Sequence, residues 1–229
     1  MISDTGLARL ADLRVEMLRM ARYVQNAYSK SSIAILGRNE HQARDVVHST
    51  AVINQYQIEL ERTIITLTGI LTPIGKDLRF LTMSMNIINI LQRIGGKCEF
   101  TCKKAIELIR KPPIGYYERM RTILGGVAQI LKGSIDNLID PSLDQAQRLC
   151  SSDSEIDRMF EETLIEIVRN IEQAPTVTSR AIDLIMILES LEEIADMATE
   201  LMEASVFVEL GKHYRCTDDV FKPVDFKAY

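Results

Sequence analysis

Carboxylates recur at helical spacing in two segments of the second half of the chain. Asp153, Asp157 and Glu161 stand four residues apart. The later segment carries a similar acidic series: Glu189, Glu192, Glu193, Asp196 and Glu200. Residues four apart share one face of a helix, so each segment would present a stripe of like charges that repel one another. Carboxylates gathered closely need either a bound cation or raised pKa values, and their oxygens suit magnesium, calcium, manganese, iron and zinc ions.

The two acidic stripes are predicted to meet across a helical hairpin that turns near Pro175. Asp157 lies 18 residues before this proline and Glu192 lies 17 after it, while Asp153 is 22 before and Asp196 is 21 after. Antiparallel helices rise equally per residue, so both pairs should stand level with each other. The spacing therefore predicts one patch with four carboxylates from two helices, either as a metal site or as a solvated acidic face.

An internal repeat indicates that only one of two related sites has been kept. Residues 13–70 recur as residues 116–173 at a constant offset of 103, and the segment that follows realigns at an offset of 100. In this frame the four acidic positions of the second copy correspond to neutral residues in the first: Thr50, Asn54, Gln92 and Gly96. Counted from Pro73, these four residues also pair at equal distances along the chain: Asn54 with Gln92, and Thr50 with Gly96. Because neutral residues replace the acids at these positions in one copy, the comparison favours a metal site over a solvated acidic face in the other.

Prolines and one turn divide the chain into segments of helical character. The breaks are Pro73, Pro112-Pro113, Pro141, Pro175 and the turn at residues 37–40. The segments between them run for roughly 25–35 residues with apolar residues three and four apart. No alternating β-branched run bounded by hairpin turns is present. Thr72-Pro73 and Asp140-Pro141 are predicted to begin helices, each as an N-cap followed by a first-turn proline.

These segments predict an all-α protein of six long helices in two tandem three-helix bundles, related by approximate pseudo-two-fold symmetry. The third and sixth helices are expected to pack between the bundles. Residues 1–111 would form the first repeat, which has lost the acidic motifs, and residues 112–213 the second repeat, which keeps them. Residues 214–229 lose the helical periodicity and are predicted to be an irregular C-terminal tail.

Composition indicates a globular chain with a core of the helical type. Hydrophobic residues make up 46% and charged residues 26%, with no Trp and 10 Met among 229 residues. A net charge of −5 without any Lys/Arg block argues against nucleic acid as a partner. No apolar stretch is long enough for membrane insertion, and the N-terminus lacks the layout of a signal peptide. A cytoplasmic location is therefore expected.

The cysteines and histidines suggest no further site. Cys98 and Cys102 lie four apart on an apolar stripe and are predicted to be core residues rather than a metal pair. No disulfide framework is predicted, and Cys150 and Cys216 are expected to be single. The three histidines are scattered, and no Glu-x-x-His, glycine-rich phosphate loop, nucleophile elbow or Cys-His pair occurs. We therefore predict no catalytic residues, no cofactor-binding loop and no enzyme activity.

The acidic motifs also carry a family resemblance. The second repeat contains Ser-Asp-Ser-Glu-Ile-Asp at 152–157 and Leu-Glu-Glu-Ile-Ala-Asp at 191–196. The first repeat contains Leu-Gln-Arg-Ile-Gly-Gly at 91–96, which is similar to the motif Leu-Glu-Arg-Ile-Gly-Asp with both acids replaced. Over roughly residues 7–213 the chain resembles the PhoU family of phosphate-signalling regulators, which is built from two tandem three-helix repeats.

The resemblance implies a metal site in the second repeat. In the family the acidic motifs bind clustered iron, zinc or other metals on the bundle surface, so the resemblance implies a divalent or trivalent cation such as iron, zinc, manganese or magnesium. It assigns this role to Asp153, Asp157, Glu192 and Asp196, with Glu161 and Glu189 as further candidates. It does not assign it to the neutral residues of the first repeat.

The resemblance also implies what the protein does. Members are cytoplasmic, are often homodimers, and act by protein contact. They link a phosphate ABC transporter and its ATPase to a sensor histidine kinase, and so repress the phosphate-starvation response. The neutral first repeat leaves open an accessory protein of a different ion transporter, such as a sodium/phosphate or potassium system. The residues also leave open a carboxylate-bridged metalloenzyme and a metal-free helical scaffold.

Overall fold

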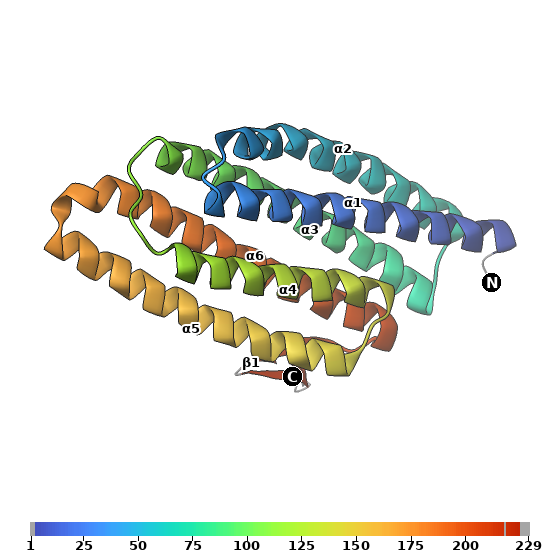
Figure 1. Cartoon of the computed structure of the whole chain (residues 1–229). Coiled ribbons are helices and arrows are strands. Elements are labelled where there is room, and N and C mark those ends of the chain that lie inside the picture. Colours follow the sequence, from blue (N-terminus) through green and yellow to red (C-terminus); the bar gives the residue numbers. More distant parts are fainter. Residues whose placement is uncertain (1–2, 218, 225–229) are drawn as a thin grey trace.

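Six long helices make up almost the whole of the computed structural model, which describes residues 3–217 and 219–224 (Figure 1). The helices are α1 (Asp4–Leu36), α2 (Glu40–Leu71), α3 (Gly75–Ile109), α4 (Tyr117–Ile139), α5 (Leu143–Gln173) and α6 (Thr178–Leu210). A short 3-10 turn, η1 (Pro175–Val177), joins α5 to α6. Strands β1 (Tyr214–Thr217) and β2 (Val220–Pro223) follow as an antiparallel pair. The predicted all-α class with two three-helix repeats is confirmed.

The helices form two bundles that share one hydrophobic core. Helices α1, α2 and α3 pack on one another, as do α4, α5 and α6, and the pairs α3–α6 and α1–α4 join the two bundles (Figure 1). Buried side chains recur three and four residues apart on each helix, so each helix buries one face. Helix α6 buries residues around most of its circumference because it packs against α3, α4 and α5. None of the helices in residues 3–217 and 219–224 is long and apolar enough to span a bilayer.

Two predicted helix starts were wrong, although the breaks themselves were placed correctly. Thr72 ends α2 in a left-handed conformation (φ 43°), so Pro73 follows a C-terminus instead of opening the first turn of α3. Asp140 also ends a helix, α4, although its backbone is not left-handed. The hydroxyl of Ser142 takes the N-cap role for α5 by accepting the Gln145 backbone N–H at 3.3 Å.

The expected irregular tail is instead a β-hairpin over most of its described length. The side chains of Tyr214 and Cys216 alternate inward along β1, and Phe221 is buried from β2. Phe221 joins a small apolar cluster with side chains of α5 and α6: Ala146, Cys150, Met202 and Val206. Residues 218 and 225–229 of the predicted tail lie outside the described residues. The hairpin was missed because each strand has only four residues, too few for a recognisable alternation.

The prediction for the cysteines was correct for one pair and wrong for the other. Cys98 and Cys102 are fully buried core residues of α3, and the Cys102 thiol donates to Ser31 Oγ at 3.3 Å. Cys150 and Cys216 are not single but form a disulfide between α5 and β1. Their spacing offers no reason to pair them, since they are 66 residues apart and meet only when the hairpin folds against α5.

Candidate metal centre

Three of the predicted carboxylates converge where α5 and α6 pack as an antiparallel pair. Asp153 and Asp157 come from α5 and Asp196 from α6, and one carboxylate oxygen of each lies within 4.8 Å of the others. Residues four apart on α5 lie on one face, which places both of its acids toward α6. The levels calculated from Pro175 paired Asp153 with Asp196, and the oxygens of these two residues and of Asp157 are close enough together to share one ion.

Asp153 is the innermost of these groups. Asp153 is only 7% exposed. Its Oδ1 is buried and has no hydrogen-bond donor among the described residues. Burial raises the pKa of Asp153 to about 7, and repulsion from Asp157, Asp196 and Glu203 acts in the same direction. A buried carboxylate oxygen without a partner is costly, and a cation would satisfy it.

The outer carboxylates lie at the rim. Asp157 and Asp196 are exposed, yet partial burial raises the pKa of each, and neighbouring acids raise it further. The pKa of Glu192 is also raised by burial and then by Asp196 and Asp157, so Glu192 stands beside the group of three. Glu161 and Glu189 are exposed and lie outside the group, and their role as ligands stays a prediction.

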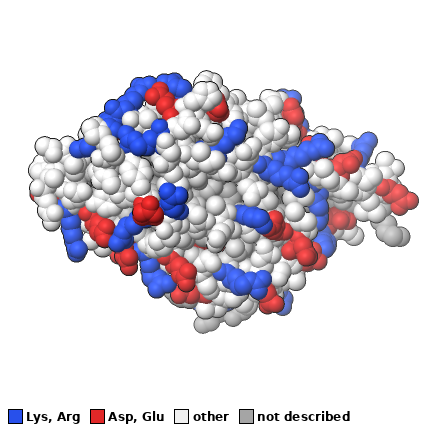
Figure 2. Space-filling view, viewed as in Figure 1, with Lys and Arg blue, Asp and Glu red and all other residues white. Residues whose placement is uncertain are grey.

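Two other acids of the α6 stripe pair with a different helix. Glu193 pairs with Lys97 of α3 at 2.5 Å, and Glu200 pairs with Arg93 of α3 at 3.6 Å. The acidic stripe of α6 therefore has two parts. Glu193 and Glu200 pair with cations of α3, while the Asp196 carboxylate lies with those of α5. Over the face of the molecule seen in Figure 2, basic and acidic side chains are likewise interspersed.

Two acidic residues near the group were missed from the sequence. Glu203 of α6 raises the pKa of Asp153, and Asp219, in the turn between β1 and β2, raises that of Asp157. Glu203 follows Glu200 by three residues, so the helical spacing could have found it. Asp219 gave no such signal, because its position depends on the unpredicted hairpin.

The equivalent place in the first repeat is occupied by neutral groups that satisfy one another. Gln92 Nε2 of α3 donates to Asn54 Oδ1 of α2 at 3.0 Å, as their matched distances from Pro73 predict. Thr50 is only 2% exposed, like its counterpart Asp153, and its hydroxyl donates to the Val46 carbonyl at 3.2 Å. The two repeats therefore place equivalent residues at equivalent positions between their second and third helices. They differ in whether those residues are charged.

Restoring four acids in the first repeat should create a second cation site. The variant combines Thr50→Asp, Asn54→Asp, Gln92→Glu and Gly96→Asp. A Cβ added at Gly96 would meet nothing within 4 Å, so that position has room for a side chain. Mn²⁺ titration by calorimetry should show about one equivalent more than in the parent chain. The matched control carries Thr50→Asn and Gly96→Asn, which add similar volume without charge. An unchanged stoichiometry in a folded acidic variant would contradict the shared geometry.

The donor set fits a hard or borderline cation. Within the described parts of the chain, the group consists of carboxylates alone, with oxygen donors from two helices and one buried, unpartnered oxygen. Such donors suit magnesium, manganese, calcium or iron, and less specifically zinc. A bound ion would offset the burial and the mutual repulsion that raise these pKa values, and would link α5 to α6.

The chain is similar to known proteins over most of its length. The family model described as PhoU domain matches twice, at residues 17–105 and 120–205. The phosphate-specific transport system accessory protein PhoU homolog 2 of Thermotoga maritima is 26% identical over 211 residues, covering 92% of this chain and 90% of that protein. The corresponding homolog of Pseudomonas aeruginosa is 27% identical over 217 residues, covering 93% and 89%.

Solved structures show the same fold. The crystal structure of PhoU from Pseudomonas aeruginosa matches with a TM-score of 0.85 and 25% identity, covering 89% of this chain and 98% of that one. The phosphate transport system regulatory protein PhoU from Streptococcus pneumoniae matches with a TM-score of 0.83 and 21% identity, covering 91% and 98%. The second matched segment of the family model ends at residue 205, before the hairpin begins.

Proposed function

The chain belongs to the PhoU family, and we propose that it regulates phosphate uptake as an accessory protein of a phosphate-specific transport system. The observation that carries this proposal is the match of the PhoU domain to both repeats, together with relatives that bear this description along nearly their whole length. The protein acts by contact with the ATPase of a phosphate ABC transporter and with a sensor histidine kinase, in the cytoplasm and as a homodimer. It carries out no catalytic step.

A cation held in the second repeat is part of this proposal. The ligands are Asp153, Asp157 and Asp196, with Glu192 beside them and with Glu161 and Glu189 as outlying candidates. The cation supplies positive charge that lets these carboxylates remain ionised close together. Asp153 provides the inner oxygen, and Asp157 and Asp196 close the site from the two helices. The support is the convergence of three carboxylates and the unpartnered Oδ1 of Asp153.

Deletion of the gene in its host tests the regulatory role. A phosphate-starvation reporter should become active in phosphate-rich medium, and the wild-type gene should silence it again. A reporter that stays silent in the deletion strain would contradict the proposal. If uptake of potassium changes instead, the protein serves a different transporter. Complementation with an Asp153→Asn/Asp196→Asn gene then measures whether the cation site is needed for regulation.

A further inference from the structure

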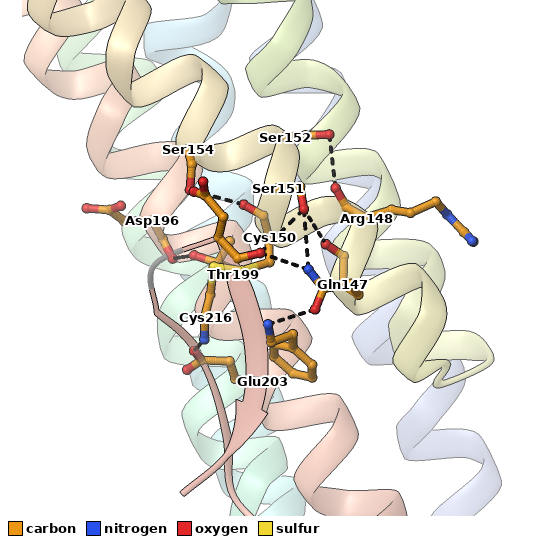
Figure 3. Close-up of a disulfide and its surroundings, with 12 residues drawn as sticks. Gln147, Arg148, Cys150, Ser151, Ser152, Ser154, Asp196, Thr199, Glu203 and Cys216 are labelled. Atoms are coloured by element: carbon orange, nitrogen blue, oxygen red, sulfur yellow. Dashed lines mark hydrogen bonds between the residues drawn. A yellow bond between two sulfur atoms is a disulfide. The ribbon is translucent and has the colours of Figure 1, made fainter.

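The C-terminal hairpin is anchored to both helices that form the acidic site. On α6, the Glu203 carboxylate accepts the Cys216 backbone N–H at 3.1 Å and also pairs with Arg215. On α5, Gln147 Oε1 accepts the Phe221 N–H at 2.9 Å, and Gln147 Nε2 donates to the Asp219 carbonyl at 2.8 Å. Figure 3 shows Gln147 and Glu203 making these bonds around the disulfide.

The disulfide fixes this anchoring next to the site. Cys150 precedes Asp153 by three residues, so it lies on the adjoining turn of α5, and its partner Cys216 lies in β1 (Figure 3). The bond closes a covalent loop of the chain from residue 150 to residue 216. All three converging carboxylates lie within that loop.

The hairpin adds negative charge to a place that already has an excess. Asp219 adopts a left-handed backbone conformation (φ 63°) in the turn, and its charge is felt by Asp157. Ser151 donates its hydroxyl to the Asp219 carbonyl at 3.4 Å, which ties the turn to α5. Holding Asp219 there against repulsion requires a restraint, and the disulfide and the apolar contacts of Phe221 supply it.

We propose that the hairpin is a disulfide-tethered wall of the cation site, with Asp219 as a further cation-facing carboxylate, so that cation occupancy and the Cys150–Cys216 redox state are coupled. The inference rests on the proposed cation site. It assigns a role to a segment that lies beyond the residues matched by the family model.

The redox step is an exchange with a dithiol. A reductant dithiol breaks the Cys150–Cys216 bond, delivers two electrons and two protons to give two thiols, and becomes a disulfide itself. Disulfides in cytosolic proteins are usually transient or redox-sensing, which agrees with a bond that opens and closes. After opening, the hairpin keeps non-covalent contacts alone, among them the hydrogen bonds to Glu203 and Gln147, the Arg215–Glu203 ion pair and the apolar cluster of Phe221. Asp219 can then move away, and cation affinity falls. By linkage, a bound cation must equally favour the closed disulfide.

Mn²⁺ binding to the full chain tests the coupling, because this ion prefers oxygen to sulfur donors. Calorimetry compares the oxidised wild type with Cys150→Ser/Cys216→Ser, Asp219→Asn and the triple variant. Each of the first two should bind Mn²⁺ about tenfold more weakly, and the triple variant should lose little more, because both changes remove the same carboxylate. Asparagine tolerates the left-handed conformation, so Asp219→Asn keeps the turn and the disulfide. Glu155→Gln, on the opposite face of α5, is the matched control and should bind as the wild type does.

Two further readouts need no cation. Maleimide labelling of the denatured oxidised chain should count two thiols, Cys98 and Cys102, and reduction should bring the count to four. Hydrogen exchange over residues 214–217 and 219–224 should rise on reduction while that of α3 does not. Unchanged exchange in the hairpin, or equal Mn²⁺ affinity in the tethered and untethered chains, would overturn the inference alone. Failure of the oxidised wild type to bind any Mn²⁺ would overturn the cation site, and the coupling with it.

Discussion

Replacing Asp153 and Asp196 together by asparagine should reduce cation affinity by at least about 100-fold and leave the fold intact. The two substitutions remove the inner ligand from α5 and the only ligand that α6 contributes to the group of three. Asparagine keeps the shape of each side chain and removes its charge, so the helix contacts persist. Metal content by mass spectrometry on untagged protein, followed by Mn²⁺ calorimetry, measures the change.

The same double variant should be more stable than the cation-free wild type near neutral pH. Neutral side chains no longer repel Asp157 and Glu203, and the buried position of Asp153 no longer has to hold a charge. Thermal unfolding in the presence of a chelator compares the two chains. The matched control is Glu155→Gln, which removes one negative charge from the opposite face of α5. If the double variant retains the metal content of the wild type, these carboxylates are not the ligands.

The helical framework could be predicted because its signals are local. Long runs with apolar residues three and four apart fix which face of a helix is buried, and prolines mark where helices stop. Counting residues from Pro73 placed Asn54 opposite Gln92, and the two side chains are hydrogen-bonded. Counting from Pro175 placed Asp153 level with Asp196, and these two carboxylates lie together with that of Asp157, while the predicted partner of Asp157, Glu192, lies outside this group of three. Equal rise per residue in antiparallel helices makes such arithmetic dependable.

What could not be predicted depends on contacts between distant segments. Cys150 and Cys216 are adjacent because the hairpin folds against α5 and α6, where Phe221 packs into a small apolar cluster. Asp219 reaches the site through the same hairpin. The helix starts failed for a different reason: a proline after a helix end and a proline in a first turn look alike in sequence, and only the backbone of Thr72 separates them.

The two repeats differ in whether the side chains at the shared place satisfy one another. In the first repeat Asn54 and Gln92 pair with each other, and Thr50 bonds to its own helix, so that bundle is complete without a ligand. In the second repeat the corresponding residues cannot satisfy one another when ionised, because ionised carboxylates only accept hydrogen bonds. The Oδ1 of Asp153 is left without a donor among the described residues. A cation bound at the proposed site would satisfy this oxygen, whereas the Asn54–Gln92 pair of the first repeat is already satisfied.

The cation-free protein should lose stability as the pH rises from about 4 to about 7, by up to about 4 kcal/mol from Asp153 alone. The pKa of this carboxyl is about 7 in the folded chain and 3.8 ordinarily. Below about pH 4 the group is protonated in both states, and the folded chain has its full stability. Between the two pKa values only the folded state holds the proton, so each rise in pH favours unfolding. Above about pH 7 the loss is complete. Asp157, Asp196 and Glu203 face Asp153, and their raised pKa values act in the same direction.

Urea unfolding of cation-free protein at about pH 5 and about pH 8 measures this dependence. Asp153→Asn should flatten the profile, because its side chain does not titrate, while Glu155→Gln should reproduce the wild-type slope. Saturating Mn²⁺ at the higher pH should restore the lost stability, since a ligand that binds only the folded state adds its binding free energy. Stability that is constant or that increases over this range would mean that Asp153 is ionised at no cost in the absence of a cation. Its buried oxygen would then require another partner, and the strongest physical reason for placing a cation there would be lost.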